Sequence, residues 1–133
     1  MKDVFGNYVI QKMLDQGNKS QVLRLFEIIK SNVLDLSKDQ YGCRVVQRIF
    51  EDNILSENQQ IQLLSLLQKD LMTLMFDNNG NHVVQKVITK MSKKHTQAII
   101  DVLKAQRGVV KKLAQNINGC RIVQRILEKY HDD

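Results

Sequence analysis

The chain has 133 residues, of which 43% are hydrophobic and 26% charged, a globular composition that argues against disorder. No apolar run approaches the roughly 20 residues that a membrane-spanning helix needs, and the charged, polar start is unlike a signal peptide, so we expect a cytoplasmic protein with no membrane partner. The formal net charge of +6 is compatible with nucleic acid, although a basic surface alone does not distinguish that partner from none.

The sequence contains an internal repeat. Four segments align without gaps, at residues 3–12, 39–48, 77–86 and 116–125. Each begins with Asp or Asn, and a glycine follows three residues later. These glycines are spaced by 36, 38 and 39 residues and are Gly6, Gly42, Gly80 and Gly119. A near-constant period in this range is typical of a solenoid, in which each unit buries its apolar face against the next.

Each aligned segment predicts a helix with one buried face. The Asp or Asn is a favoured residue ahead of a helix, the glycine permits a close backbone approach, and an apolar β-branched pair is followed four positions later by a second apolar pair. In chain order, we expect motif helices near 6–16, 42–51, 80–91 and 119–129. The first three are followed by second helices at 20–30, 56–68 and 94–106, and by short third helices at 33–37, 71–76 and 109–114. The chain is therefore predicted to be all-α, a single array over 1–133 with three helices per repeat.

Three positions of each motif helix do not belong to its apolar face. They are spaced i, i+1 and i+4, and we name them the edge, stacking and glutamine positions. The edge residues are Asn7, Cys43, Asn81 and Cys120. The stacking residues are Tyr8, Arg44, His82 and Arg121. The glutamines are Gln11, Gln47, Gln85 and Gln124. Positions i and i+4 share a helix face, so stacked repeats should align these residues into one continuous surface.

The residue types on this surface suit unpaired RNA bases. An amide offers both a donor and an acceptor to a base edge, and aromatic rings and guanidinium planes stack on splayed bases. A cation follows each glutamine and can contact the phosphate backbone; these cations are Lys12, Arg48, Lys86 and Arg125. One glutamine on a helix is usually only solvated, but solvation does not require four glutamines in one register.

The sequence gives little support to other chemistries. Cys43 and Cys120 lie two repeats apart, whereas stacked helices are separated by about 8–10 Å and a disulfide needs Cα atoms within about 7 Å. We therefore interpret both cysteines as small groups that touch a base edge. His82 shares its face with no Cys, Asp or Glu, which argues against a metal site. With no acid–base pair, nucleophile constellation or phosphate loop, we expect neither an enzyme nor a cofactor.

The motif Gly-(Asn/Cys)-(Tyr/Arg/His)-(Val/Ile)-(Ile/Val)-Gln-(Lys/Arg), found four times across nearly the whole chain, resembles the repeats of the Pumilio (PUF) family of RNA-binding proteins. The resemblance implies a right-handed α-solenoid of about four stacked three-helix repeats, in which edge residue and glutamine select one base and the stacking residue packs on it. It implies uracil for Asn7/Gln11 and Asn81/Gln85, and adenine for Cys43/Gln47 and Cys120/Gln124. Because the family binds RNA antiparallel to the protein, the implied site is 5′-AUAU-3′. The order of motifs resembles the second to fifth repeats of an eight-repeat domain, so we expect an excerpt of a longer domain.

The resemblance also implies partners. They are single-stranded RNA, in mRNA 3′ untranslated regions, and co-repressor or decay proteins that carry out repression or decay. Two alternatives stay open: a PUF relative with low sequence preference that acts in ribosome biogenesis, and a protein-interaction solenoid. Both ends of the chain lack an obvious polar capping repeat, and exposed apolar ends favour end-to-end self-association.

Overall fold

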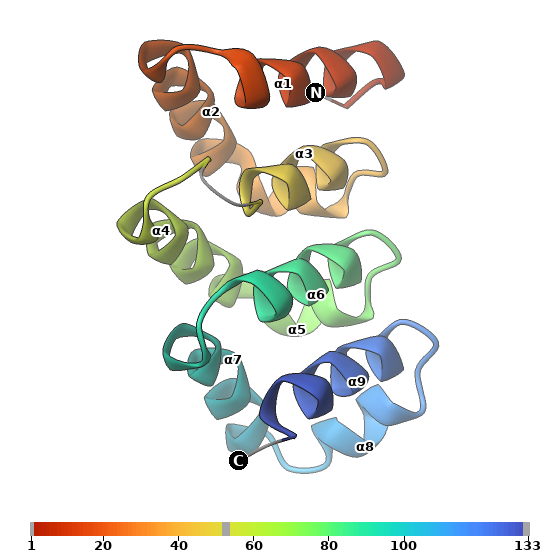
Figure 1. The fold of residues 1–133 in the computed structure, drawn as a ribbon. Coiled ribbons are helices and arrows are strands. Elements are labelled where there is room, and N and C mark those ends of the chain that lie inside the picture. Colours follow the sequence, from red (N-terminus) through yellow and green to blue (C-terminus); the bar gives the residue numbers. More distant parts are fainter. Residues whose placement is uncertain (1, 52–53, 132–133) are drawn as a thin grey trace.

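The computed structural model describes residues 2–51 and 54–131, and its regular elements over those ranges are all helical (Figure 1). The motif helices are α1 (Val4–Gln16), α3 (Gly42–Ile49), α6 (Gly80–Lys90) and α9 (Gly119–Tyr130). The remaining elements are α2 (Lys19–Lys38), α4 (Glu57–Leu67), the 3-10 helix η1 (Gln68–Asp70), α5 (Leu71–Phe76), α7 (Lys93–Ala105) and α8 (Val109–Ala114). The all-α prediction is therefore confirmed.

The motif helices form one layer of a stacked array. They follow one another in chain order along the molecule, with α2, α4 and α7 to one side (Figure 1). Helix α3 packs against both α1 and α6, and α6 packs in turn against α9. The short helices α5 and α8 pack on the motif helices that follow them. Each repeat thus completes its core with its neighbours, as the solenoid prediction requires.

Helix α2 spans the second and third helices predicted at 20–30 and 33–37, and a kink at the non-helical residue Asn32, with φ −128° and ψ 15°, divides it between those two ranges. The Asn32 side chain donates to the Ile28 carbonyl at 2.9 Å and so gives that carbonyl a partner at the kink. Between α7 and α8 the corresponding break contains Gly108, directly before α8, whose φ of 79° lies in the left-handed region that favours glycine.

The apolar face of the motif helices is buried most completely in the middle of the array. Val45, Val46 and Ile49 in α3 are all 0% exposed, and the aligned residues of α6 are nearly as buried. In α1, however, Val9 was predicted to be core and is 56% exposed. Helix α1 has only one motif helix packed beside it, α3, so its other side faces solvent in this chain.

Each motif helix begins with the same two kinds of residue, a capping Asp or Asn and a glycine three residues later. Asp77 Oδ2 accepts hydrogen bonds from the backbone N–H groups of Asn79 (2.9 Å) and Gly80 (2.7 Å), which satisfies N–H groups that the first turn of a helix leaves free. A Cβ atom at Gly80 would lie 2.8 Å from the Leu74 carbonyl oxygen, so glycine permits α5 and α6 to approach closely. The aligned capping residues accept from their own glycine N–H in the same way; they are Asp3, Asp39 and Asn116.

Candidate nucleic-acid interface

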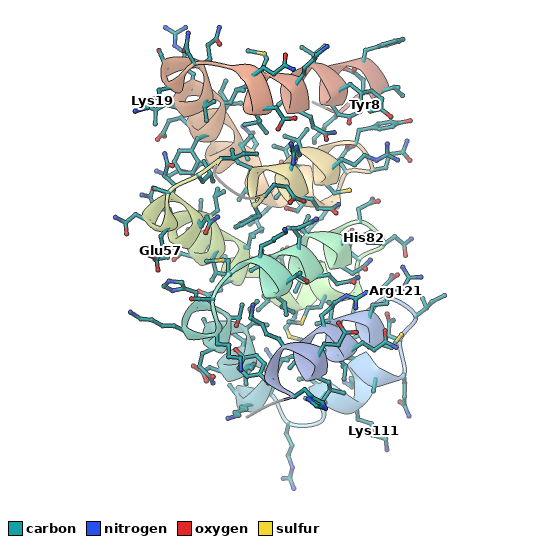
Figure 2. All side chains as sticks on the ribbon, viewed as in Figure 1. Tyr8, Lys19, Glu57, His82, Lys111 and Arg121 are labelled. Atoms are coloured by element: carbon teal, nitrogen blue, oxygen red, sulfur yellow. The ribbon has the colours of Figure 1, made fainter. Side chains whose placement is uncertain are left out.

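The stacking residues lie along one edge of the array. All four are exposed, and Figure 2 shows Tyr8, His82 and Arg121 following one another down the same side of the molecule. The Arg44 guanidinium lies over the Tyr41 ring, with Cζ 5.6 Å from the ring centroid, which favours one orientation of this flat cation. The structure therefore brings together the flat groups that the sequence placed in register.

Two shallow hollows lie between the first three stacking residues. One hollow, with a volume of ≈ 280 Å³, is lined by Tyr8 and Arg44 together with Gln11 and Gln47. The next, of ≈ 440 Å³, is lined by Arg44 and His82 together with Gln47 and Cys43. Each hollow thus has a flat group from either of two repeats and at least one glutamine amide, which is the arrangement that a stacked and edge-bonded base needs.

Three of the four edge residues lie beneath this surface rather than on it. Asn7 and Asn81 are 0% exposed and Cys43 is 4% exposed, whereas Cys120 is partly exposed; the sequence placed all four on the same face as the glutamines. Burial is possible because each edge side chain donates to the carbonyl oxygen three residues earlier, which satisfies its polar atom. These acceptors are Val4 O (2.8 Å), Gln40 O (3.4 Å), Asn78 O (2.9 Å) and Ile117 O (3.4 Å).

An asparagine at the edge position fixes the following glutamine. Asn81 Nδ2 donates to the carbonyls of Asp77 (2.8 Å) and Asn78 (2.9 Å), which leaves its Oδ1 to accept from Gln85 Nε2 at 2.9 Å. The first repeat has the same geometry, in which Gln11 Nε2 donates to Asn7 Oδ1 at 2.8 Å. In both repeats the asparagine thus fixes which way the glutamine amide faces, with Nε2 toward the asparagine and Oε1 directed away from it.

A cysteine at the edge position holds its glutamine less firmly. The Cys43 sulfur is a weak acceptor compared with an amide oxygen. Burial raises the pKa of the Cys43 thiol, while Arg44 and a hydrogen bond from Gln47 offset part of that rise, so the thiol stays neutral near pH 7. Both Cys43 and Cys120 are free thiols. The two kinds of repeat therefore differ in how strongly the glutamine amide is oriented.

Most cations after the glutamines are paired with carboxylates in the structure. Lys12 is exposed, but Arg48 contacts Asp15 of the preceding repeat, and Lys86 lies 2.7 Å from Glu51 of the preceding repeat. The hydrogen bond from Lys86 is the largest effect that lowers the pKa of the Glu51 carboxyl. These cations connect repeats in the free protein, and a phosphate would have to compete for them.

Sequence reasoning missed the contacts between repeats. Asn79 and Asn118, which precede the motif glycines, donate from Nδ2 to backbone carbonyls of the preceding repeat, Lys38 O (2.9 Å) and Phe76 O (3.1 Å). The acids Asp15 and Glu51 likewise share one register, three residues after the motif cation. Aligning the four segments on positions beyond the base-reading triad could have revealed both sets.

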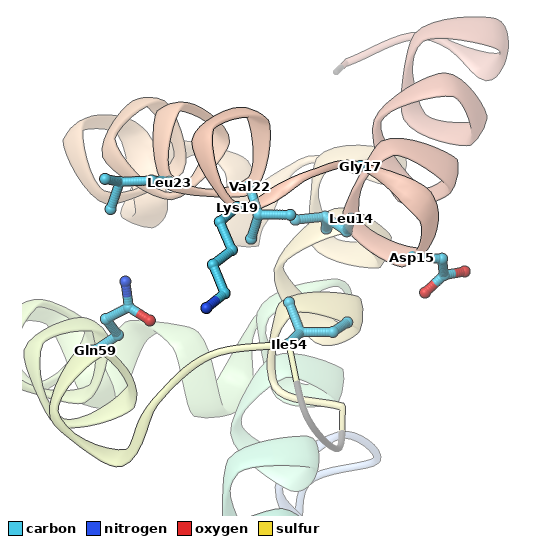
Figure 3. Close-up of a pocket in the computed structure, with 8 residues that line it drawn as sticks. All are labelled: Leu14, Asp15, Gly17, Lys19, Val22, Leu23, Ile54 and Gln59. Carbon is cyan, nitrogen blue, oxygen red and sulfur yellow. The ribbon is translucent and has the colours of Figure 1, made fainter.

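A separate hollow of ≈ 480 Å³ lies at the opposite end of α1 (Figure 3). Its lining includes Leu14, Lys19, Ile54 and Gln59 and none of the edge, stacking or glutamine residues. Within the part of the chain that the structure describes, no group of three or more His, Cys, Asp or Glu side chains is placed to hold a metal ion. Over the same residues, no helix combines the length and the apolar character needed to cross a membrane.

Comparison with known proteins gives the same result for sequence and structure. The profile described as "Pumilio-family RNA binding repeat" matches residues 1–30, 32–67, 71–104 and 110–133. Suppressor protein MPT5 of Saccharomyces cerevisiae is 34% identical over 131 residues, which are 94% of this chain and 15% of that protein. Fem-3 mRNA-binding factor 2 of Caenorhabditis elegans is 31% identical over 140 residues, which are 98% of this chain and 22% of that protein.

Solved structures of RNA complexes are also similar. PUF-8 in complex with PBE-RNA superposes with a TM-score of 0.88 at 37% identity, over 96% of this chain and 36% of that one. The Puf3 RNA binding domain bound to Cox17 RNA 3′ UTR recognition sequence site B gives a TM-score of 0.87 at 37% identity, over 97% of this chain and 35% of that one. With the repeat profile matched along nearly its whole length and the array geometry shared, this chain belongs to the Pumilio family of RNA-binding repeat proteins.

Proposed function

We propose that this chain binds single-stranded RNA sequence-specifically and reads about one base per repeat. The observation that carries the proposal is the pair of hollows between the first three stacking residues. The hollow between Tyr8 and Arg44 is also lined by Gln11 and Gln47. A base placed there stacks on flat groups from two repeats and presents its edge to an amide. Base–aromatic stacking contributes about 1–3 kcal/mol per base.

The asparagine repeats favour uracil. In the first and third repeats the glutamine nitrogen already donates to the edge asparagine, so Gln11 and Gln85 offer their Oε1 atoms to the base. Uracil has a donor at N3, which suits this acceptor, whereas cytosine has an acceptor at N3 and is repelled. The Asn/Gln pairs implied to read uracil by the family resemblance thus have a physical reason to do so.

The cysteine repeats favour adenine. Gln47 is held only by a weak sulfur acceptor, so its amide is free to offer a donor and an acceptor together. The adenine edge has the matching pair, the N6 amino group and the N1 acceptor. With the antiparallel binding of the family, the fourth to first repeats read 5′-AUAU-3′, and we number these bases one to four from the 5′ end.

The cellular role follows from the relatives. Fem-3 mRNA-binding factor 2 is named for mRNA binding, and the Puf3 domain was solved on a 3′ UTR recognition sequence. We extend both to this chain and propose that it acts in the cytoplasm on mRNA 3′ untranslated regions, with repression or decay carried out by protein partners.

The test measures binding of the chain to a short RNA containing AUAU and to one with cytosine as the second base. We expect about five- to tenfold weaker binding of the cytosine RNA, the value of one hydrogen bond. Equal affinities would favour a non-selective RNA-binding protein, and no binding to either RNA would favour a protein-interaction solenoid.

A double variant tests the residue assignment. Asn81→Ser with Gln85→Glu installs the pair that reads guanine in the family, so the preference at base two should move from uracil toward guanine. The matched control is Asn58→Ser with Gln62→Glu, because both residues are exposed on α4 with the same i, i+4 spacing. The control should leave the preference unchanged.

A further inference from the structure

Arg125 contacts the glutamine of the preceding repeat. Its Nε donates to Gln85 Oε1 at 3.3 Å, and its Nη1 donates to the Glu128 carboxylate at 3.0 Å and 2.9 Å. Arg125 was predicted to follow the phosphate backbone. In the structure it instead connects α9 to the amide that the third repeat uses to meet a base.

Arg125 has a different partner from the aligned Arg48 and Lys86 because Thr89 replaces the acid of the preceding motif helix. Arg48 and Lys86, aligned with Arg125, pair with an acid on the preceding motif helix. At that register α6 carries Thr89, whose hydroxyl donates to the Gln85 backbone carbonyl at 2.9 Å. Thr89 offers no charge to a cation from the next repeat. Arg125 is therefore directed to Gln85 and to Glu128 on its own helix.

These contacts fix the Gln85 amide at both atoms. Its Nε2 donates to Asn81 Oδ1 at 2.9 Å, and its Oε1 accepts from Arg125. Rotating the amide by half a turn would place its oxygen against the Asn81 oxygen and its nitrogen against the guanidinium donors. Either mismatch leaves polar atoms without partners, which is costly where water is excluded. A carbonyl oxygen has a second lone pair, so Oε1 still accepts from a base.

We propose that Arg125 is a positioning residue that makes the third repeat discriminate uracil from cytosine more strongly than the first repeat does. The proposal rests on the proposed function, in which both repeats read uracil. In the first repeat, Gln11 has the same bond to Asn7, but Arg48 pairs with Asp15. Gln11 therefore lacks the second restraint and turns its nitrogen toward a cytosine N3 at a smaller cost.

The experiment measures the uracil-to-cytosine affinity ratio at base two and at base four in the same RNA, using the whole chain. In the unmodified protein both ratios should favour uracil, with the larger ratio at base two. Arg125→Met removes the donor but keeps much of the side-chain length, and we expect it to lower the base-two ratio about five- to tenfold while base four is unchanged. Arg48→Met is the matched control, which loses the same charge and should leave the base-two ratio as it was.

A second variant should also lower the uracil-to-cytosine affinity ratio at base two, without changing Arg125. Thr89→Glu supplies the missing acid in register and should draw Arg125 away from Gln85, which lowers the base-two ratio again. Melting temperatures of all variants identify any that fail to fold. An unchanged base-two ratio in Arg125→Met and Thr89→Glu would overturn the proposal, as would equal losses at bases two and four. If the unmodified protein shows no uracil preference at either base, the proposed function itself is wrong.

Discussion

The first and third repeats have asparagine at the edge position, and the second and fourth have cysteine. Both kinds of repeat begin their motif helix with the same backbone contacts, and they differ in how the glutamine amide is held. All four motif helices begin with a capping side chain bonded to a glycine N–H, and all four edge residues donate to the carbonyl three residues earlier. The asparagine oxygens accept from the glutamine amides at 2.8 Å and 2.9 Å, whereas Cys43 offers Gln47 a weakly accepting sulfur. The comparison separates the part of the motif that builds the solenoid from the part that orients a hydrogen-bonding group.

If the proposed function holds, base preference depends partly on a residue that lies beneath the surface. Asn81 is fully buried, so in this structure it acts by presenting an oxygen to Gln85. Replacing that oxygen with the weakly accepting sulfur of a cysteine loosens the same amide. Under the proposed function, a buried residue of this kind would change which base is preferred while the surface keeps a glutamine in all four repeats.

The largest expected effect on stability comes from a substitution at a motif glycine, where both kinds of repeat have the same backbone contacts. Gly80→Val places side-chain atoms where even a Cβ would lie 2.8 Å from the Leu74 carbonyl oxygen. We expect a loss of roughly 2–3 kcal/mol in the free energy of unfolding, in the range for overpacked cores, measured by chemical denaturation. Gly6→Val is the control, because the nearest atoms there belong to the flexible Asp3 side chain. Equal losses for the two variants would contradict this account of the close approach.

The next effect compares the two edge residues by stability. Asn81→Ala removes two bonds to backbone carbonyls and the acceptor for Gln85, and we expect it to cost about 1–2 kcal/mol of unfolding free energy. Cys43→Ala removes one long thiol contact and should cost less. Thermal and chemical denaturation of both variants measure this difference. A cysteine variant that is the less stable of the two would show that packing, and not hydrogen bonding, dominates at this position.

Local pattern predicted much of the fold and part of the interface. The caps, glycines and apolar spacing all lie within ten-residue segments, and they located the four motif helices. The short helices predicted at 71–76 and 109–114 are also present, as α5 and α8. The exposed stacking residues followed from helical geometry alone. The sequence placed a break between residues 30 and 33, and the structure has a kink there at Asn32.

The remaining features depend on neighbouring repeats and were not visible in a single motif. The burial of Asn7 and Asn81 requires knowledge of where their amide hydrogens find acceptors. The pairing of Arg48 with Asp15 and of Lys86 with Glu51 depends on the offset between stacked helices. Sequence spacing gives positions along one helix, but it does not give that offset.

Exchanging cysteine and asparagine at the edge position tests whether this residue sets the base preference of a repeat. Cys43→Asn gives the second repeat an edge amide able to use the same Gln40 carbonyl that the thiol now contacts, and its oxygen should then fix Gln47. We expect the preference at base three to move from adenine to uracil, with a ratio change of about tenfold. Binding to four RNAs that differ only at base three measures it. The reciprocal variant Asn81→Cys should move base two toward adenine, and a change in neither direction would refute the fixed-amide explanation.

The smallest expected effect concerns the ion pair that connects a cysteine repeat to an asparagine repeat. Glu51 pairs with Lys86 at 2.7 Å and Lys90 at 3.3 Å, and its carboxyl pKa is lowered chiefly by the hydrogen bond from Lys86. A carboxyl with a lower pKa in the folded state stabilises the fold above its unfolded-state pKa, and this contribution disappears as the pH falls through the folded-state value. Glu51→Gln should abolish that pH dependence at a cost of about 0–1 kcal/mol at neutral pH.

The same variant releases cations toward RNA. The slope of log affinity against log salt concentration should steepen by about 0.7 for each released cation that gains a phosphate. Glu57→Gln is the matched control: it makes the same charge change at a carboxylate that pairs with His95, at 2.6 Å, away from the motif helices. If both variants steepen the slope equally, the change reflects net charge alone; a steeper slope for Glu51→Gln only would show that the cations between repeats exchange a carboxylate for a phosphate when RNA binds.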